Sequence, residues 1–292
     1  MKFGVQTWFG GRAATPEYLV RVGQSMEQRG FNSIWAAEHV VLFEEYKSQY
    51  PYSSKGEFPF DAHSCSFEPF TALTFIAAHT SKIRLGTGIC ILPQRNPVYT
   101  AKQVADLDVL SGGRFDFGIG VGWSEEEFQA LDVPFEKRGA RAADYMRVMR
   151  SLWCDDVSSF KGDYYNLPEC VQGPKSVQKP HPPVFFGGES MPALRRVAEF
   201  GQGWYGANLR PETLPAHLKR LDVLLKERGR TLDEIYLSIA PFGTRFDLDD
   251  VKRFADLGVK QIMLVGFGLT MENMDEVLDD FAERFVVPGK DI

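Results

Sequence analysis

Cysteine and histidine are scarce in this sequence, and neither forms a recognisable metal-binding motif. The 292 residues include only four cysteines and five histidines, and no C-x-x-C pair occurs. The cysteines are Cys65, Cys90, Cys154 and Cys170. Isolated thiols of this kind are typical of a reduced cytoplasmic protein rather than of a disulfide framework. We therefore expect a cytoplasmic protein without a metal site.

Basic charge and long apolar runs are also lacking. The 33 Lys and Arg residues are outnumbered by 39 Asp and Glu residues, which gives a formal net charge of -6. This balance argues against a broad nucleic-acid or membrane-surface binder, although a local site could still hold an anionic ligand. No apolar stretch approaches the roughly 20 residues of a transmembrane helix, and the N-terminus lacks a signal-peptide core. We expect neither nucleic acid nor a membrane as a partner.

What the sequence does contain is a regular alternation of short apolar segments and helical patterns. The apolar segments are rich in Val, Ile and Phe, as buried parallel strands are. They span residues 3–8, 33–38, 83–92, 115–121, 183–187, 203–207, 235–241 and 261–266. Eight strands, each followed by a helix, predict an α/β fold of the (β/α)8 TIM-barrel type, with residues 1–292 as one domain. A doubly wound sheet is disfavoured because no early strand is followed by G-x-G-x-x-G.

Helix boundaries follow from capping residues and apolar stripes. Thr15 and Pro16 predict the start of a first helix, and Gly30 predicts its end. A leucine stripe from Leu214 to Leu225 predicts another helix that ends before Gly229.

Two segments are too long for ordinary connections. They are residues 40–67, which carry several Tyr and Phe residues, and residues 155–182, which are rich in Pro and Gly. Neither has a strong period, so both are predicted as long loops. The 40–67 loop leaves the carboxyl end of a strand, where barrel active sites lie, and this favours a lid. A packed aromatic cluster that pins the loop down is the alternative.

Polar and glycine-rich motifs follow several of the predicted strands. Glu38 and His39 place an acid and an imidazole at the end of the second strand, although a histidine bonded to a neighbouring loop would look the same. Gly86 and Gly88 interrupt the third strand, and three further glycines alternate at positions 118, 120 and 122. These glycines indicate either close approach of a flat ligand or tight packing within the barrel.

The fifth strand ends in a glycine turn that suits an anion. Gly187 and Gly188 are followed by Ser190, a predicted N-cap, so free N–H groups and a helix dipole point outward. An ordinary capped junction explains the same pattern. Glu189 suits a phosphate site only if its carboxylate turns away or bonds the backbone.

Together these segments resemble the luciferase-like monooxygenase family of (β/α)8-barrel oxidoreductases. The resemblance rests on Glu38-His39, on the stretch LGTGICILPQRNPVYTAKQVADLDVLSGGRFDFGIGVGW at 85–123, and on QKPHPPVFFGGESMPALRRVAEFGQGW at 178–204. The run at 120–153 is most similar to the branch of the family that uses coenzyme F420, a 5-deazaflavin.

The resemblance implies a role for each candidate residue. His39 would be the active-site imidazole, with Glu38 next to it, and Gly88–Ile89 would form a non-prolyl cis peptide behind the cofactor ring. Val121, Gly122 and Trp123 would lie along the cofactor. The turn formed by Gly187, Gly188, Glu189 and Ser190 would hold its phosphate. Bacterial luciferases that use FMN carry a phosphate-binding arginine at the position of Val121, and its absence here favours the deazaflavin.

The expected activity is hydride transfer between coenzyme F420 and a small organic substrate beneath the 40–67 loop. The first alternative is an FMN-dependent two-component monooxygenase, which would need a flavin reductase as its partner. The second is a barrel that binds a flavin or deazaflavin without catalysis. The resemblance also implies a homodimer.

Overall fold

Eight parallel strands form a closed barrel in the computed structural model, which describes residues 1–11, 14–64, 66–242 and 245–292. Around the barrel the strands follow the order β1-β2-β3-β5-β8-β9-β10-β11, and β11 pairs with β1. Their bounds are β1 (Lys2–Thr7), β2 (Ser33–Ala36), β3 (Arg84–Thr87), β5 (Phe115–Gly120), β8 (Val184–Gly187), β9 (Gly203–Ala207), β10 (Tyr236–Ala240) and β11 (Gln261–Gly266). The predicted (β/α)8 barrel is confirmed, with a strand in each expected segment.

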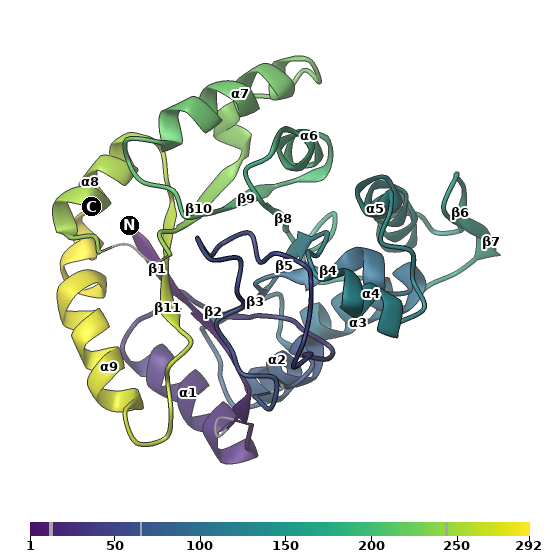
Figure 1. Cartoon of the computed structure of the whole chain (residues 1–292). Helices are drawn as coiled ribbons and strands as arrows, with labels where there is room; N and C mark the ends of the chain where they lie inside the picture. The colour runs from purple at the N-terminus through teal and green to yellow at the C-terminus, as the bar shows by residue number, and fades with distance from the viewer. Residues whose placement is uncertain (12–13, 65, 243–244) are drawn as a thin grey trace.

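Helices surround the barrel (Figure 1). They are α1 (Pro16–Gln28), α2 (Pro69–Ala78), α3 (Pro97–Leu110), α4 (Glu125–Ala130), α5 (Arg138–Cys154), α6 (Met191–Phe200), α7 (Leu214–Lys226), α8 (Leu248–Asp256) and α9 (Met274–Phe281). The Thr15 side chain caps α1 by accepting the Tyr18 N–H at 3.1 Å, as the sequence predicts. None of the described helices is both long and apolar enough to span a membrane.

Two predicted segments differ in detail from the structure. Residues 83–92 form two strands, β3 and the short β4 (Cys90–Ile91), because a cis peptide at Gly88–Ile89 separates them. The long connection predicted at 155–182 is present, and it contains an antiparallel hairpin of β6 (Ser158–Lys161) and β7 (Asn166–Cys170) that the sequence pattern did not reveal. Strands this short give too little alternation for a sequence pattern to reveal them.

Aromatic side chains fill the inside of the barrel. Trp35, Phe185 and Tyr205 form a buried cluster there with Ala240 and Met263. The barrel glycines are explained by this packing, because a Cβ built on Gly86 would lie 2.4 Å from the Trp35 indole. A Cβ on Gly118 would lie 1.9 Å from the Thr87 carbonyl oxygen and 2.7 Å from the same indole.

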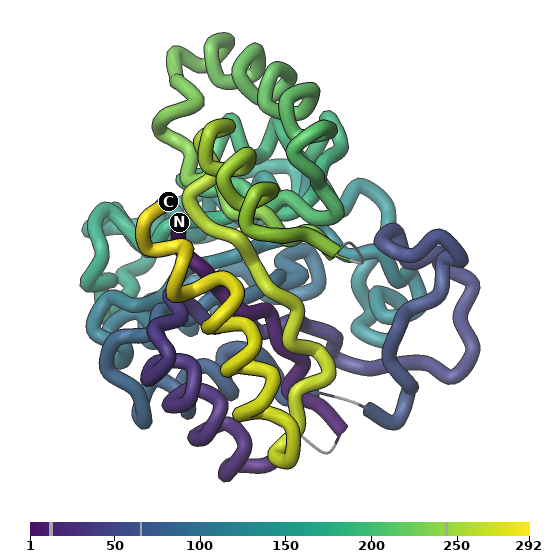
Figure 2. Tube along the Cα trace, turned by 90° about the vertical axis from the view of Figure 1, so that its left-hand side faces the viewer, coloured from purple at the N-terminus to yellow at the C-terminus, as the bar shows by residue number. Residues whose placement is uncertain are grey.

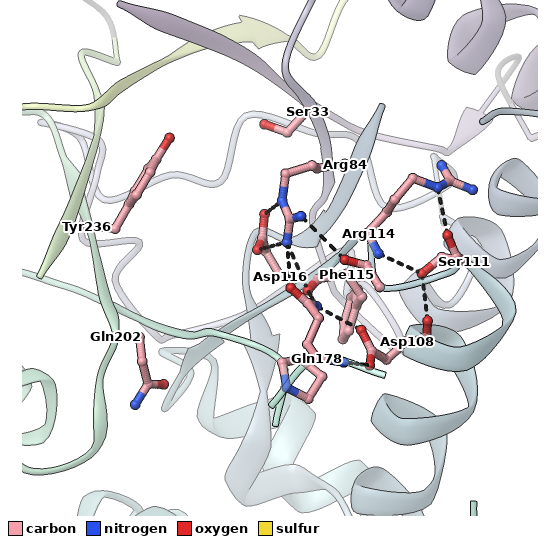
Figure 3. A network of polar contacts seen from close by, with 12 residues as sticks. Ser33, Arg84, Asp108, Ser111, Arg114, Phe115, Asp116, Gln178, Gln202 and Tyr236 are labelled. Atoms are coloured by element: carbon pink, nitrogen blue, oxygen red, sulfur yellow. Dashed lines mark hydrogen bonds and ion pairs between the residues drawn. The ribbon is translucent and has the colours of Figure 1, made fainter. Parts of the chain in front are cut away.

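A polar network closes the amino-terminal end of the barrel (Figure 3). Arg84 begins β3 and donates from Nε to Asp116 on β5 at 2.8 Å. The Arg84 guanidinium also donates to Gln178 at 3.2 Å, and Gln178 donates in turn to Asp108 at 2.7 Å. This network, together with the aromatic cluster, leaves the opposite end of the barrel as the place for a site.

Candidate active site

The predicted site residues gather at the carboxyl ends of four neighbouring strands. Glu38 and His39 follow β2, Gly88 and Ile89 follow β3, Val121 to Trp123 follow β5, and Gly187 to Ser190 end or follow β8. These strands are consecutive around the barrel, since β2 pairs with β3, β3 with β5, and β5 with β8. Residues spread over 150 positions of sequence therefore share one sector of the barrel mouth.

His39 is held by a buried carboxylate that the sequence did not single out. Its Nδ1 lies 3.1 Å from Oε2 of Glu127 on α4, and the two side chains are 8% and 1% exposed. Glu127 also accepts the Val40 N–H at 2.7 Å and the Gln94 amide at 3.0 Å. Burial alone would raise the pKa of Glu127, but these hydrogen bonds and the nearby imidazole lower it. An ionised Glu127 favours the tautomer of His39 that carries its proton on Nδ1, and no side chain of the described residues hydrogen-bonds Nε2.

Glu38 adjoins His39 in the sequence but contacts other residues. Its carboxylate accepts the Ile91 N–H at 2.5 Å and the Nε–H of Arg95 at 2.9 Å, and it is buried. Arg95 also bonds Glu68 at 2.6 Å. Glu38 thus ties the end of β2 to the segment that follows the cis peptide, and Glu127 is the acid that contacts the imidazole.

The cis peptide at Gly88–Ile89, which the family resemblance implies, is present. The Gly88 N–H donates to the Ala36 carbonyl at 2.7 Å, and the Gly88 carbonyl accepts a hydrogen bond from the Gln6 amide. Gln6 is fixed on its other side because Tyr205 donates to it at 2.5 Å. No sequence pattern pointed to Gln6 as a site residue, because its partners come from distant strands.

The Ile89 side chain lies over the ends of β5 and β8. A Cβ built on Gly120 would be 2.2 Å from Cδ1 of Ile89, and one on Gly187 would be 3.3 Å from its Cγ2. These two glycines therefore make room for Ile89, and packing explains their presence at the barrel mouth.

The turn after β8 has the features expected of an anion site. Gly188 has a φ of +100°, which favours glycine, and the Ser190 side chain caps α6 by accepting the Ala193 N–H at 3.3 Å. The Glu189 carboxylate bonds the Ala207 N–H at 2.6 Å and so is engaged by the backbone of β9. Burial raises the pKa of Glu189. With that carboxylate occupied, the turn fits a phosphate group.

Aromatic rings of the 40–67 loop cover His39. The Phe58 ring lies 4.7 Å from the imidazole and 5.6 Å from Trp123, and Tyr50 lies 5.2 Å from Trp123. Phe60 stacks on Trp8 at 4.5 Å. Figure 2 shows the loop, in indigo, at the end of the molecule away from the two termini. The loop therefore packs as an aromatic cluster and also covers the imidazole.

Helix α4 fastens this loop. Its Glu126 carboxylate accepts the Lys47 N–H at 2.6 Å and the Ser48 N–H at 3.2 Å. The Ser48 hydroxyl in turn accepts the Glu125 N–H at 2.9 Å. The signal in the sequence was the run of three glutamates that opens α4 directly after the Trp123 segment.

Residues 1–243 match the luciferase-like monooxygenase family, and the chain belongs to that family. The residues described above therefore form the candidate active site of a member of the luciferase-like monooxygenase family.

The chain is similar to an uncharacterized relative and to proteins whose names give different cofactors. An uncharacterized protein of Mycobacterium tuberculosis is 31% identical over 251 residues, which cover 86% of this chain and 85% of that protein. The FMNH2-dependent dimethylsulfone monooxygenase of Pseudomonas putida is 33% identical over 144 residues, 48% of this chain and 39% of that enzyme. The coenzyme F420-dependent tetrahydromethanopterin reductase from Methanopyrus kandleri has a similar fold, with a TM-score of 0.75, 17% identity and 98% of each chain covered.

Proposed function

We propose that this protein is a coenzyme F420-dependent oxidoreductase that transfers a hydride between the deazaflavin and a small organic substrate. The observation that carries the proposal is His39, whose imidazole is held by the buried Glu127 at 3.1 Å. His39 and the cis peptide follow the paired strands β2 and β3. The F420-dependent reductase with a similar fold and the resemblance of residues 120–153 support this cofactor. The absence of an arginine at Val121 supports it as well.

Each residue of the site would have a separate role in such an enzyme. The bound cofactor would supply or accept the hydride. His39 would give or take a proton at Nε2, and Glu127 would hold the imidazole in the required tautomer. The aromatic rings over His39 would exclude water from the reacting atoms. Backbone N–H groups at Gly188, Glu189 and Ser190 would bind the phosphate, and Trp123 and Gly122 would lie along the cofactor.

Glu38 has a supporting role in this proposal. Both of its oxygens are engaged, by Arg95 and by the Ile91 N–H, so it holds the segment that carries the cis peptide. We therefore propose that Glu38 positions Ile89 and does not exchange protons with the substrate.

Cofactor titration tests the proposal directly. Purified protein is titrated with F420 and with FMN, and binding is followed by absorbance and fluorescence. We expect F420 to bind more tightly, and binding of FMN without F420 would refute the assignment. The His39→Ala variant should keep most of its cofactor affinity but lose about 100-fold or more in rate.

A second candidate function is an FMN-dependent two-component monooxygenase with a flavin reductase as partner. The observation that favours it is the identity with the Pseudomonas putida enzyme, which spans 48% of this chain. Oxygen uptake that depends on reduced FMN would support it. Retained deazaflavin that no donor reduces and no acceptor oxidises would instead indicate a binding protein without catalysis.

The proposed enzyme is a single-domain homodimer. Light scattering on the purified chain checks the dimer, because the mass should be twice that of the 32.9 kDa chain.

A further inference from the structure

Positive charges gather at the start of α5, next to the turns that follow β5 and β8. Arg138 is the first residue of α5 and donates from Nε to the Gly122 carbonyl at 3.1 Å. Its guanidinium lies over the Phe135 ring at 3.8 Å. Arg196 comes from α6, and its Nη1 would be 3.0 Å from a Cβ built on Gly139. Both side chains are half-buried.

These guanidinium groups lack a matching negative charge. Within the described part of the chain, the side chains of Arg138 and Arg196 form no ion pair, and the Arg196 side chain makes no hydrogen bond. Burial lowers the pKa of both guanidinium groups. The positive charge of Arg138 lowers the pKa of Arg196 further, and the positive charge of Arg141 lowers the pKa of Arg138 further. Glu125 opposes this for Arg138, but it lies beyond ion-pair distance.

Arg141 adds a third positive charge that is almost fully buried. It is 6% exposed, and it donates to the Glu136 carbonyl at 3.4 Å and to the Pro134 carbonyl. Its Nε–H has no hydrogen-bond partner among the described residues. The amino-terminal end of α5 adds a positive dipole to the cluster, and no side chain caps it. Three cations at a helix start repel one another, and an anion bound among them would relieve the repulsion.

The cluster is joined to two turns at the barrel mouth. Ile119 on β5 is in register with Phe186 on β8, so the turn at Gly122 runs beside the turn at Gly188. Arg138 bonds the first of these turns, and Arg196 belongs to the helix that follows the second. The two guanidinium groups therefore come from the helix start that bonds one turn and from the helix that follows the other turn.

We propose that Arg138 and Arg196 bind the phosphate group of the cofactor. The inference rests on the proposed function, because it takes a phosphate-bearing flavin or deazaflavin as the ligand. Arg141 holds the start of α5 in place and adds long-range charge. The ligand class is a phosphate ester joined to a flat ring.

Paired ligands with and without phosphate test the inference. Wild type, Arg138→Gln and Arg196→Gln are titrated with F420 and with its phosphate-free deazaflavin precursor. We expect each substitution to weaken F420 binding by about 10- to 100-fold, because a hydrogen bond to a charged group contributes roughly 1.5–3 kcal/mol. Binding of the precursor should change by less than about 2-fold.

Arg195→Gln is the matched control, since Arg195 is the exposed neighbour of Arg196 on the same helix. It should leave both affinities unchanged. Equal losses for both ligands, or unchanged F420 binding in both test variants, would overturn the inference while leaving the proposed function intact. If the wild type binds neither F420 nor FMN, the proposed function and the inference fail together. Circular dichroism of each variant identifies a loss that comes from misfolding.

Discussion

At the scale of single residues, the role of a carboxylate is set by the partner that it faces. Glu38 and Glu127 are both buried glutamates near His39, yet one bonds Arg95 and the other bonds the imidazole. The sequence could place His39 at the barrel mouth because it directly follows a predicted strand. It could not tell which acid would contact the ring, because Gln94, Arg95 and Glu127 come from distant parts of the chain.

Glu127→Gln tests the pairing at this scale. A neutral amide cannot hold the proton of His39 on Nδ1 in the same way, so we expect kcat to fall by about 10- to 100-fold with little change in cofactor affinity. Turnover is measured with the deazaflavin that the wild type binds. In a His39→Ala background the same substitution should have almost no further effect, and additive losses would contradict a shared role.

Gly188→Ala tests the turn that is proposed to hold the phosphate. A φ of +100° is unfavourable for alanine, and the new Cβ would lie 3.2 Å from that of Ala193. We expect a loss of roughly 1–2 kcal/mol in the free energy of unfolding, measured with urea, and weaker F420 binding. Gly268→Ala is the control, because a Cβ there meets nothing within 4 Å and the φ is ordinary. Equal stabilities of the two variants would argue against strain at Gly188.

At the scale of elements, helix α4 connects the imidazole to its cover. Glu127 holds His39, while its neighbour Glu126 accepts two N–H groups of the 40–67 loop. The sequence predicted the length of this loop and its aromatic content. It could not predict that α4 holds the loop, because those contacts join residues almost 80 positions apart.

Glu126→Ala should loosen the 40–67 loop. The Lys47 and Ser48 N–H bonds outweigh the effect of burial and lower the pKa of Glu126 from 4.5 to about 2. A lowered pKa means that the bonds are complete above about pH 4.5 and are lost only as the pH falls towards 2. We expect the variant to exchange amide hydrogens of residues 47–48 at least about 10-fold faster at pH 7, measured by mass spectrometry.

The wild type should keep its protection factors constant from pH 7 down to about pH 4.5. Glu125→Ala is the control, since the Glu125 side chain contacts only Gln129, at 3.5 Å, among the described residues. Fast exchange in the wild type, or equal protection in the two variants, would show that α4 does not hold the loop.

At the scale of the whole molecule, the barrel is closed at its amino-terminal end by the polar network of Arg84, Asp116 and Gln178, here called the polar floor, and the 40–67 loop covers its opposite end. The eight strands followed from their apolar segments, because alternation with helices is a strong pattern. The polar floor in Figure 3 could not be predicted, since Arg84, Asp116 and Gln178 meet only once the barrel has closed. The hairpin of β6 and β7 could not be predicted either, because its strands are too short to be recognised and it packs beside α5 in the folded chain.

Asp116→Ala tests the floor. Removal of the carboxylate leaves the largely buried Arg84 guanidinium without its negatively charged partner. We therefore expect the free energy of unfolding, measured with urea, to fall by about 3 kcal/mol. Asp280→Ala removes the exposed partner of Arg284, and it should cost less than about 0.5 kcal/mol. Similar losses in the two variants would mean that the floor contributes no more than a surface ion pair.

The pairing of β1 with β11 has a consequence for how the chain is made. Lys2 lies opposite Gln261, and the terminal amino group donates to the Gly289 carbonyl at 2.8 Å, so the two ends of the chain meet (Figure 1). β1 is therefore synthesised long before β11, the strand that completes its pairing. Until residue 266 has emerged, one edge of β1 has no partner strand and is open to pairing with other chains. The barrel can therefore close only after almost the whole chain described here has been made.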